Sequence, residues 1–532
     1  MMQTITETVS DTGTPRLALR AVSKRYPNGT LASDDVSLQV RRGHIHALVG
    51  ENGAGKSTVM KMLYGLEQPS AGTILLDGAP LTLRTPADAI AAGIGLVPQH
   101  LQLVPSFTVA QNVVLGSEPG RFGMLDRRAA IERVRDLSLR FGLDADPLAP
   151  VAGLSLGEQQ RVEILKTLYR GASIILLDEP TAVLTPSEAQ ALFGALRALT
   201  LQGVTVLLIT HKLSEVLEVS DRFTVLRGGR VTGQAAAAEV DARQLTEMIV
   251  GRPLPPLQVA RTAARGQAAL VSARGIGVRG RDGRARLHDI SFDIAAGEIL
   301  GIAAVEGNGQ GLLADVLAGL LRPDAGGATV DGRGVTGAGV RAARAAGVGA
   351  IPEDRLHNGV AADMSIADNA IAGAYHRRPL SRLGWLYPDA AQAMAAGLIE
   401  RFGVASRGPQ QAIGALSGGN LQKIVLGREI ERAPRFLVAS QPTRGVDLGA
   451  AQALRRSLVE LRDSGAAVLL ISSDLDEVLA LSDRIAVLVQ GRIVGHFNGG
   501  AGAATVGACM TGGHQPGAEA TLDAPFTGGV AA

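Results

Sequence analysis

The residues with the clearest chemical meaning form a glycine-rich loop near the N-terminus. The loop fits the pattern G-x-x-x-x-G-K-[ST] without a mismatch, and Thr58 follows it: Gly50, Glu51, Asn52, Gly53, Ala54, Gly55, Lys56 and Ser57. Glycines let backbone N–H groups close around phosphate oxygens, and the N-terminus of a following helix adds partial positive charge. Lys56 would reach the β- and γ-phosphates of a nucleoside triphosphate, and Ser57 would bind Mg²⁺.

Two carboxylates follow an apolar run further along the chain. Asp178 and Glu179 come directly after the run Ile174 to Leu177. Charges at the end of a buried strand are costly unless they serve a metal or a reaction. Asp178 would bind Mg²⁺, and Glu179 would orient and deprotonate an attacking water. On their own the two acids could instead cap a helix, but their place downstream of the glycine-rich loop favours hydrolysis.

The elements around these residues indicate an α/β fold. The loop lies between an apolar run, HIHALV, and a helical pattern, STVMKMLYGL. Together with SIILLDEP and VTVLLITH, these short apolar runs are typical of strands buried on both faces, so we expect a mostly parallel sheet. Residues 100–165 lack such runs and predict a separate helical lobe.

The whole plan occurs twice in the chain. The segment from Leu287 to Gln310 repeats the segment from Ser33 to Lys56 at an offset of 254 residues, and LSGG at Leu416 repeats LSLG at Leu154 at an offset of 262. Eight extra residues therefore enter the second copy between these points. A repeat this long indicates a duplicated domain. We expect an N-terminal tail (1–16), a first domain (17–250), a Pro-rich linker (251–269), a second domain (270–512) and a C-terminal tail (513–532), with little regular structure beyond about Asn498.

Several further motifs resemble those of ABC ATPases. The segment LSLGEQQR at Leu154 resembles the ABC signature, Gln99 matches the Q-loop, His211 matches the switch histidine, and Tyr26, placed before the first strand, matches an aromatic that stacks on adenine. Alone, such a glutamine, histidine or tyrosine is more often a surface or packing residue, but the ordered set is specific. The resemblance implies two tandem P-loop ABC ATPase domains, each a mainly parallel sheet with a helical subdomain. It also implies ATP and Mg²⁺ as cofactors, with Gln99 a further Mg²⁺ ligand and His211 catalytic.

The second copy has lost most of the chemical groups. Ala304, Gln310 and Gly311 stand where the first copy has Gly50, Lys56 and Ser57; the other replaced positions carry Gly280, Glu353, Ser440, Gln441 and Ser473. Yet this copy keeps the better signature, Ser417-Gly418-Gly419, and an Asp447 that resembles the D-loop aspartate. In ABC ATPases each nucleotide lies between the Walker motifs of one half and the signature of the other. The resemblance therefore implies one intact site, in which the first copy's groups meet Ser417, Gly418, Gly419 and Asp447.

Other sequence segments resemble the ATPase subunits of ABC importers. LSGGNLQK and IPEDR resemble ATPases of sugar importers, whereas QHLQLVPSFTVAQNVVLG, QQRVEILKTLYRGA, DEPTAVLTPSE and QPTRGVD resemble the nucleoside-importer branch that works with basic-membrane-lipoprotein-type binding proteins. We favour nucleosides over sugars. This resemblance implies a peripheral subunit at the cytoplasmic face of the membrane. Its partners would be transmembrane permease subunits and an extracytoplasmic substrate-binding protein, and it would not touch the cargo.

Composition narrows the alternatives. Lys+Arg (52) and Asp+Glu (50) nearly balance and aromatic content is 3%, which disfavours a general nucleic-acid binder. One cysteine excludes a cysteine metal cluster. No apolar run reaches about 18 residues, so another chain must supply any membrane span. The rival interpretation is a soluble ABC ATPase acting on ribosomes or DNA. The short linker disfavours ribosome-associated types, and the lone cysteine disfavours zinc-bearing repair types.

Overall fold

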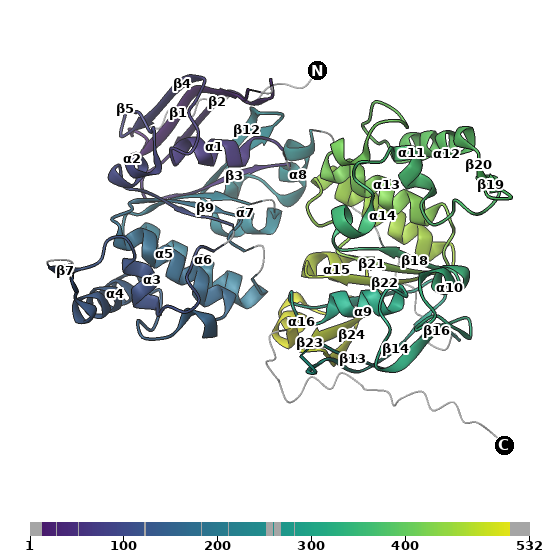
Figure 1. Cartoon of the computed structure of the whole chain (residues 1–532). Coiled ribbons are helices and arrows are strands. Elements are labelled where there is room, and N and C mark those ends of the chain that lie inside the picture. Colours follow the sequence, from purple (N-terminus) through teal and green to yellow (C-terminus); the bar gives the residue numbers. More distant parts are fainter. Residues whose placement is uncertain are drawn as a thin grey trace. The chain divides into compact units, whose positions relative to one another are not determined.

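The computed structural model describes residues 13–27, 29–51, 53–99, 101–121, 124–181, 184–210, 212–251, 259, 268–280 and 282–510. The chain divides into two compact units, Met1–Pro255 and Pro256–Ala532. Figure 1 shows that each unit has its own sheets and its own group of helices.

The first unit alternates strands and helices along the chain. Its strands are β1 (Leu17–Arg25), β2 (Leu31–Val40), β3 (Ile45–Gly50), β4 (Ala71–Leu76), β5 (Ala79–Leu81), β6 (Ile94–Val97), β7 (Gly120–Arg121), β8 (Met124–Leu125), β9 (Ile174–Asp178), β10 (Thr205–Ile209), β11 (Arg222–Arg227) and β12 (Arg230–Ala236). Its helices are α1 (Lys56–Leu63), α2 (Pro86–Ala91), α3 (Val109–Val114), α4 (Arg127–Phe141), α5 (Leu156–Tyr169), α6 (Pro186–Leu201), α7 (Leu213–Val219) and α8 (Ala242–Val250), with 3₁₀ turns at Val151–Gly153 and Ala237–Glu239.

A six-stranded sheet forms the centre of this unit. Its order is β12-β11-β3-β10-β9-β6, and all neighbours are parallel except β11 and β12. Alternate residues of β9 enter two different cores: Ile175 and Leu177 pack with the helical lobe, whereas Ile174 and Leu176 pack with α1. The apolar runs were therefore correctly interpreted as strands buried on both faces.

Two parts of the first unit were not expected from the sequence. A four-stranded antiparallel sheet, β2-β1-β4-β5, packs on the α1 side of the centre. The predicted helical lobe is present as α3, α4 and α5, but it also contains the short hairpin β7–β8. Thr108 caps α3 and Ser155 caps α5, each through a capping box that satisfies the first backbone N–H groups.

The second unit repeats the plan. Its strands are β13 (Ala269–Arg279), β14 (Ala285–Ala295), β15 (Ile299–Ala303), β16 (Ala325–Val330), β17 (Arg333–Gly334), β18 (Val348–Ile351), β19 (Ser381–Arg382), β20 (Trp385–Leu386), β21 (Phe436–Ser440), β22 (Ala467–Ser472), β23 (Arg484–Val489) and β24 (Arg492–Asn498). Its helices are α9 (Gln310–Leu317), α10 (Val340–Ala345), α11 (Ile366–Ile371), α12 (Pro388–Arg401), α13 (Gly418–Ile430), α14 (Leu448–Asp463), α15 (Leu475–Leu481) and α16 (Ala503–Met510). A π turn spans Arg355–Gly359 and a 3₁₀ turn Ile413–Ala415.

Backbone details confirm that the two copies were aligned correctly. The central sheet of the second unit has the order β18-β21-β22-β15-β23-β24, which is that of the first unit. Glu179 and its partner Gln441 both have positive φ, 46° and 48°, an uncommon conformation for residues with a side chain. One expectation was wrong: the chain beyond Asn498 is not without regular structure, because α16 packs Val506 and Met510 into a core with Val478.

Candidate functional site

The glycine-rich loop joins the end of β3 to the start of α1. Gly55 caps α1 with a φ of 99°, and a Cβ atom there would lie 2.3 Å from the carbonyl oxygen of Ala32. At Gly50 a Cβ atom would lie 2.2 Å from the carbonyl oxygen of Leu226. Glycine is therefore required sterically at both positions, which explains why the motif has glycines there. Asn52 lies outside the described residues.

Lys56 lies inside this loop. Its side chain is 6% exposed, and its Nζ donates hydrogen bonds to the carbonyl oxygens of Gly50 (2.6 Å) and Glu51 (2.9 Å). Burial lowers its pKa, while the nearby carboxylates of Glu179 and Asp178 oppose that shift. The ammonium group is thus held by neutral carbonyls at the loop, from which it can transfer to phosphate oxygens. Ser57, the next residue, is exposed.

The two predicted carboxylates stand at the end of β9. Burial raises the pKa of Asp178, and the neighbouring Glu179 carboxylate raises it further, whereas Lys56 lowers it. The backbone N–H of Glu179 donates to the carbonyl of Ile209 on β10 (2.9 Å). The side-chain Nε2 of Gln99 donates to Oε2 of Glu179 (3.1 Å). The structure therefore brings Gln99 and Glu179 together from separate loops after β6 and β9.

Tyr26 and His211 require separate comment. Tyr26 was expected before the first strand, but it follows β1, because the chain already enters a strand at Leu17. Its hydroxyl lies 3.5 Å from Oγ1 of Thr58 on α1, and the Nζ of Lys24 lies 5.4 Å from its ring centroid. The ring is thus next to the glycine-rich loop despite the wrong sequence placement. His211 lies outside the described residues.

Sequence reasoning missed a buried carboxylate below these strand ends. Glu215 on α7 is buried and accepts hydrogen bonds from the hydroxyls of Thr210 (2.6 Å) and Thr181. The Nζ of Lys212 lies 3.4 Å from its Oε1. The network joins the segment after β9 to the segment after β10 through Thr181 and Thr210. Comparison of the two copies could have identified Glu215, because the second copy also has a glutamate, Glu477, at the matching position.

The second unit keeps the backbone of the glycine-rich loop without its charge. Gly307 and Gly309 have φ values of 94° and 99°, close to those of Gly53 and Gly55. Gln310 occupies the position of Lys56 and is equally buried, and its Oε1 has no hydrogen-bond partner among the described residues. A neutral amide cannot supply the charge that a triphosphate needs at this position.

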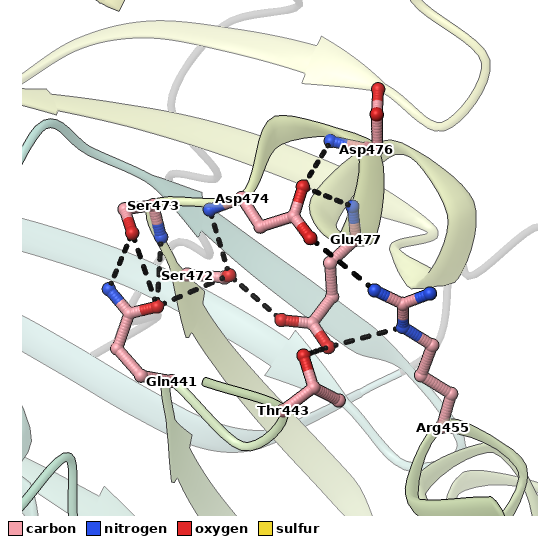
Figure 2. A network of polar contacts seen from close by, with 8 residues as sticks. All are labelled: Gln441, Thr443, Arg455, Ser472, Ser473, Asp474, Asp476 and Glu477. Atoms are coloured by element: carbon pink, nitrogen blue, oxygen red, sulfur yellow. Dashed lines mark hydrogen bonds and ion pairs between the residues drawn. The ribbon is translucent and has the colours of Figure 1, made fainter. Parts of the chain in front are cut away.

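In the second unit a closed polar network includes the positions that correspond to Glu179 and His211 (Figure 2). The Nε2 of Gln441 donates to Oγ of Ser473 (3.0 Å), and its Oε1 accepts from the N–H of Ser473 (3.2 Å). Glu477 accepts from Ser472 (2.8 Å) and Thr443 (2.6 Å). The residues at the positions of Glu179 and His211 therefore bond to each other.

Ion pairs also connect the loops of the second unit that correspond to the candidate site of the first unit. The guanidinium of Arg444 lies 3.3 Å from Glu306 in the glycine-rich loop, and it also pairs with Glu353, which stands at the position of Gln99. These two carboxylates would repel phosphate groups. The losses predicted for the second copy are thus accompanied by internal contacts that use the remaining groups.

Comparison with known proteins identifies this architecture. A family model described as "ABC transporter" matches residues 33–182 and, a second time, residues 287–444, which together are more than half of the chain. The chain belongs to the ABC transporter family. Each match begins before a glycine-rich loop and ends after the strand that carries Asp178 or Ser440, so the family covers both copies.

Similar proteins extend over nearly the whole chain. Guanosine import ATP-binding protein NupO of Bacillus subtilis (strain 168) is 43% identical over 477 residues, covering 90% of this chain and 93% of that protein. Glucose import ATP-binding protein TsgD13 of Haloferax volcanii is 44% identical over 514 residues, covering 90% of this chain and 92% of that protein. A crystal structure of the archaeal ribosome recycling factor aABCE1 with the stalk protein aP1 matches with a TM-score of 0.56 at 18% identity, over 88% of this chain and 87% of that one. At that identity the likeness shows the fold alone.

The ABC signature segments differ between the two units. Ser155 forms a capping box: its hydroxyl accepts from the N–H of Glu158 (3.3 Å), and the Glu158 carboxylate accepts from the N–H of Ser155 (2.7 Å). In the second unit the Ser417 hydroxyl accepts from Nδ2 of Asn420 (2.8 Å), and no side-chain cap is formed on α13. The backbone N–H groups at the start of α13 are thus left for another acceptor, whereas those of α5 are capped.

The remaining signature residues lie beside the D-loop of the same unit. A Cβ atom added to Gly419 would lie 2.9 Å from Oδ2 of Asp447, and one added to Gly418 would lie 2.7 Å from the Arg355 guanidinium. Asp447 caps α14 by accepting from the N–H of Ala450 (2.7 Å). Its carboxylate therefore has a structural role in addition to the one that the family resemblance implies.

Proposed function

We propose that this chain is the ATP-hydrolysing subunit of an ABC importer for nucleosides, with one working ATPase site. The observation that carries the proposal is the contrast between matching positions in the two units. Lys56, Asp178 and Glu179 of the first unit have the charges that phosphoryl transfer needs, whereas Gln310, Ser440 and Gln441 have none. ATPase activity follows from family membership and from this intact set.

The first unit supplies the groups that bind the phosphates and activate the attacking water. Backbone N–H groups of the loop from Gly50 to Gly55 bind the phosphates, and Lys56 exchanges the two carbonyls that it contacts for phosphate oxygens. Glu179 takes a proton from the attacking water, and the hydrogen bond from Gln99 holds its carboxylate in place. His211 would stabilise the charge that develops on the γ-phosphate.

The residues also fit Mg²⁺. Burial and the Glu179 charge raise the pKa of Asp178, so a nearby cation would stabilise its ionised form. Ser57, Gln99 and Asp178 supply only oxygen ligands, which Mg²⁺ prefers, and Mg²⁺ commonly completes its shell with substrate phosphates and water. The ion would neutralise charge on the β- and γ-phosphates.

We further propose that hydrolysis in the first unit depends on Ser417, Gly418, Gly419 and Asp447 of the second. The capping pattern supports this assignment. Ser155 is engaged in a capping box, whereas α13 begins without a side-chain cap behind Ser417. An uncapped helix N-terminus is suited to an anion such as the γ-phosphate. The poorer signature of the first unit, at Ser155, would face the degenerate site of the second unit.

Permease subunits are the proposed partners, together with an extracytoplasmic substrate-binding protein. Within the described part of the chain, none of the helices has the length and apolarity needed to cross a bilayer. A cavity of about 250 Å³ lies between β6 and α5, and its lining includes Pro98, Gln102, Glu163 and Lys166. Two of its lining residues, Pro98 and Gln102, flank Gln99 in the sequence. A permease segment bound in this cavity would therefore sense the nucleotide through Gln99. The subunit would then be peripheral to the cytoplasmic face of the membrane.

The proposed cargo is a nucleoside. The guanosine and glucose import proteins are about equally similar to this chain, at 43% and 44% identity. Nucleosides are favoured by the segments after Gln99, around Glu163 and after Asp178, which resemble the nucleoside branch. A soluble ATPase acting on ribosomes has less support, because the likeness to aABCE1 is one of fold.

Reconstitution with permeases, sought among the products of neighbouring genes, tests the proposal. The chain should copurify with the permeases, and a nucleoside presented with its binding protein should stimulate ATP hydrolysis in proteoliposomes. Ribose and glucose should not stimulate it. Copurification with stimulation only by a sugar would overturn the cargo assignment, while copurification with ribosomes instead of permeases would overturn the importer assignment.

A further inference from the structure

An exposed hairpin of the second unit has side chains that the ATPase function does not use. In β19–β20, Ser381 pairs with Leu386 and Arg382 pairs with Trp385. The tip residues are among the most exposed apolar side chains of the described chain: Leu383 is 92% exposed, Trp385 78% and Leu386 51%. Figure 1 shows the hairpin at the margin of the lobe that contains α11 and α12. Such a group of apolar side chains is a candidate interaction surface.

The backbone of the hairpin keeps these side chains outside. Leu383 and Gly384 form the two-residue turn with φ values of 53° and 87°. Asn, Asp and Gly are the usual residues where a hairpin turn needs positive φ, so leucine at the first position is unfavourable for the fold. The base of the hairpin is anchored, because Leu380 packs with Ile371, Ala374 and Ala391. A rigid base thus presents a strained tip, a combination that is more common at functional than at structural positions.

The segment around the hairpin is basic. From residue 372 to 387 the chain contains Arg377, Arg378, Arg382 and His376 but no Asp or Glu. Tyr375 and Tyr387 are also exposed, and the hydroxyl of Tyr375 accepts from Arg341 on α10 (3.3 Å). The first acidic residue after it is Asp389, on α12. Exposed aromatic and leucine side chains are therefore combined with cations.

The segment that leads into the hairpin differs in charge and length between the two units. The residues from 115 to 126 include Arg121 but also Glu118 and Asp126. β7 begins six residues after α3 ends (120 − 114), whereas β19 begins ten residues after α11 ends (381 − 371). Four of the eight extra residues of the second copy thus lie in the basic segment before β19. The hairpin recurs in the first unit as β7–β8, but Arg377 and Arg378 lie in the segment that is longer in the second unit.

We propose that the β19–β20 hairpin of the second unit binds the surface of an anionic phospholipid bilayer. Arg377, Arg378 and Arg382 pair with lipid phosphates, while Trp385, Leu383 and Leu386 enter the headgroup region. Trp and Tyr are enriched at this depth of a bilayer, and clustered cations next to them are attracted to anionic lipids. Aliphatic leucines gain nothing from a nucleic-acid backbone, which disfavours RNA as the partner. The surface goes beyond the proposed function, and vesicle binding can be measured without permease or ATP.

The chain contains a single tryptophan, so its fluorescence reports on this hairpin alone. With the full chain and vesicles of phosphatidylcholine plus phosphatidylserine, Trp385 emission should shift to shorter wavelength and iodide quenching should fall. Pure phosphatidylcholine vesicles should give neither effect, and high salt should reverse both because it screens the attraction. The triple variant Arg377→Glu, Arg378→Glu, Arg382→Glu should cosediment with anionic vesicles at least about a hundredfold more weakly, because three cations are lost and three anions are gained.

A matched variant of the first unit provides the control. The double variant Arg127→Glu, Arg128→Glu changes two arginines just after β8 and should cosediment like the unaltered chain. A separate variant of the hairpin, Leu383→Gly, should relieve the strain in the turn and still weaken vesicle binding, because it removes an apolar side chain. Unchanged emission with anionic vesicles at low salt would overturn the proposal. Equal binding of the triple variant would also overturn it, and so would shielding of Trp385 that appears only when the permeases are added, because the hairpin would then bind protein.

Discussion

Nε2 of Gln99 donates a 3.1 Å hydrogen bond to the carboxylate of Glu179. The two residues follow β6 and β9, which are adjacent parallel strands, so their carboxyl ends place both side chains at one edge of the sheet. In the second unit the matching pair is Glu353 and Gln441. The amide of Gln441 bonds to Ser473, and the carboxylate of Glu353 pairs with Arg444. The hydrogen bond between the residues that follow these two strands therefore occurs in the first unit and is replaced by other contacts in the second.

Glu179→Gln should lower steady-state ATP turnover by roughly a hundredfold or more, the range expected when a general base is lost. The amide keeps the size of the side chain, so ATP binding should persist. Colorimetric phosphate release and equilibrium binding of a fluorescent ATP analogue measure the two properties. Turnover like that of the unaltered chain would show that another group activates the water.

The second unit offers the complementary change. Gln441→Glu places a carboxylate at the matching position, where backbone φ is nearly the same. Turnover should not rise, because Gln310 and Ser440 still provide neither the lysine nor the Mg²⁺ carboxylate. A clear rise in turnover would contradict the single-site interpretation.

His46 makes the first unit sensitive to acid. It lies in β3 and bonds to Thr224 (2.8 Å); burial, helped by Arg222 and His44, lowers its pKa from 6.5 to about 3. The folded state therefore binds this proton less readily than the unfolded state, so stability is complete above pH 6.5 and is lost as the pH falls towards 3. At pH 5 the loss is about 2 kcal/mol. Denaturant unfolding at pH 7 and pH 5 measures it.

The second unit has Leu300 at the position of His46, which provides the substitution for the control. In His46→Leu the decrease in unfolding free energy between pH 7 and pH 5 should be smaller by about 2 kcal/mol. Thr224 loses its partner, so overall stability can decrease while the pH dependence still diminishes. An unchanged pH dependence would mean that His46 is not the responsible group.

Much of the nucleotide site could be predicted because its residues are local in sequence. The glycine-rich loop and the apolar run before Asp178 each specify their own geometry, and the repeat located their counterparts. The antiparallel sheets could not be predicted in the same way. Their strands are half exposed, with alternating patterns interrupted by bulges near Ala21 and Gly275, so the apolar signal is weak.

Other features depended on contacts between distant residues. The role of Glu215 depends on its hydrogen bonds with Thr181 and Thr210, which only the folded structure shows. The Ser155 capping box was visible in principle as S-x-x-E, but the resemblance to the signature concealed it. Tyr26 was placed wrongly relative to β1 because RLALRAVSKRY lacks a clear alternation of apolar and polar residues.

Cross-linking tests the proposed coupling through the lobe after Gln99. In a Cys509→Ser background, Ser117→Cys places a thiol on the exposed loop between α3 and β7. It should cross-link to a permease carrying thiols in its cytoplasmic loops, more strongly in one nucleotide state than in another. Thr73→Cys, exposed on β4 of the antiparallel sheet, should not. The reverse pattern would place the permease on the other side of the unit.

Matching substitutions in the two signatures test which one serves ATP hydrolysis. Ser417→Arg changes the unit that lacks the lysine and both carboxylates, yet it should abolish turnover, because a bulky cation would stand where the serine hydroxyl and the first N–H groups of α13 approach the γ-phosphate. In the proposed composite arrangement Ser155 belongs to the degenerate site, so Ser155→Arg should leave most turnover intact. Steady-state ATPase assays on variants with equal cooperative melts measure the difference.

The capping box requires a second pair of variants. Ser155→Arg also removes an N-cap, which costs about 1 kcal/mol, so a partial loss of activity could reflect stability alone. Aspartate caps helices as well as serine, so Ser155→Asp should keep both the melt and the turnover. Ser417→Asp should fold equally well but lose turnover, because its carboxylate would repel the γ-phosphate. If Ser155→Asp abolishes hydrolysis while Ser417→Asp does not, the signature assignment is reversed; if both retain it, neither signature contributes to the working site.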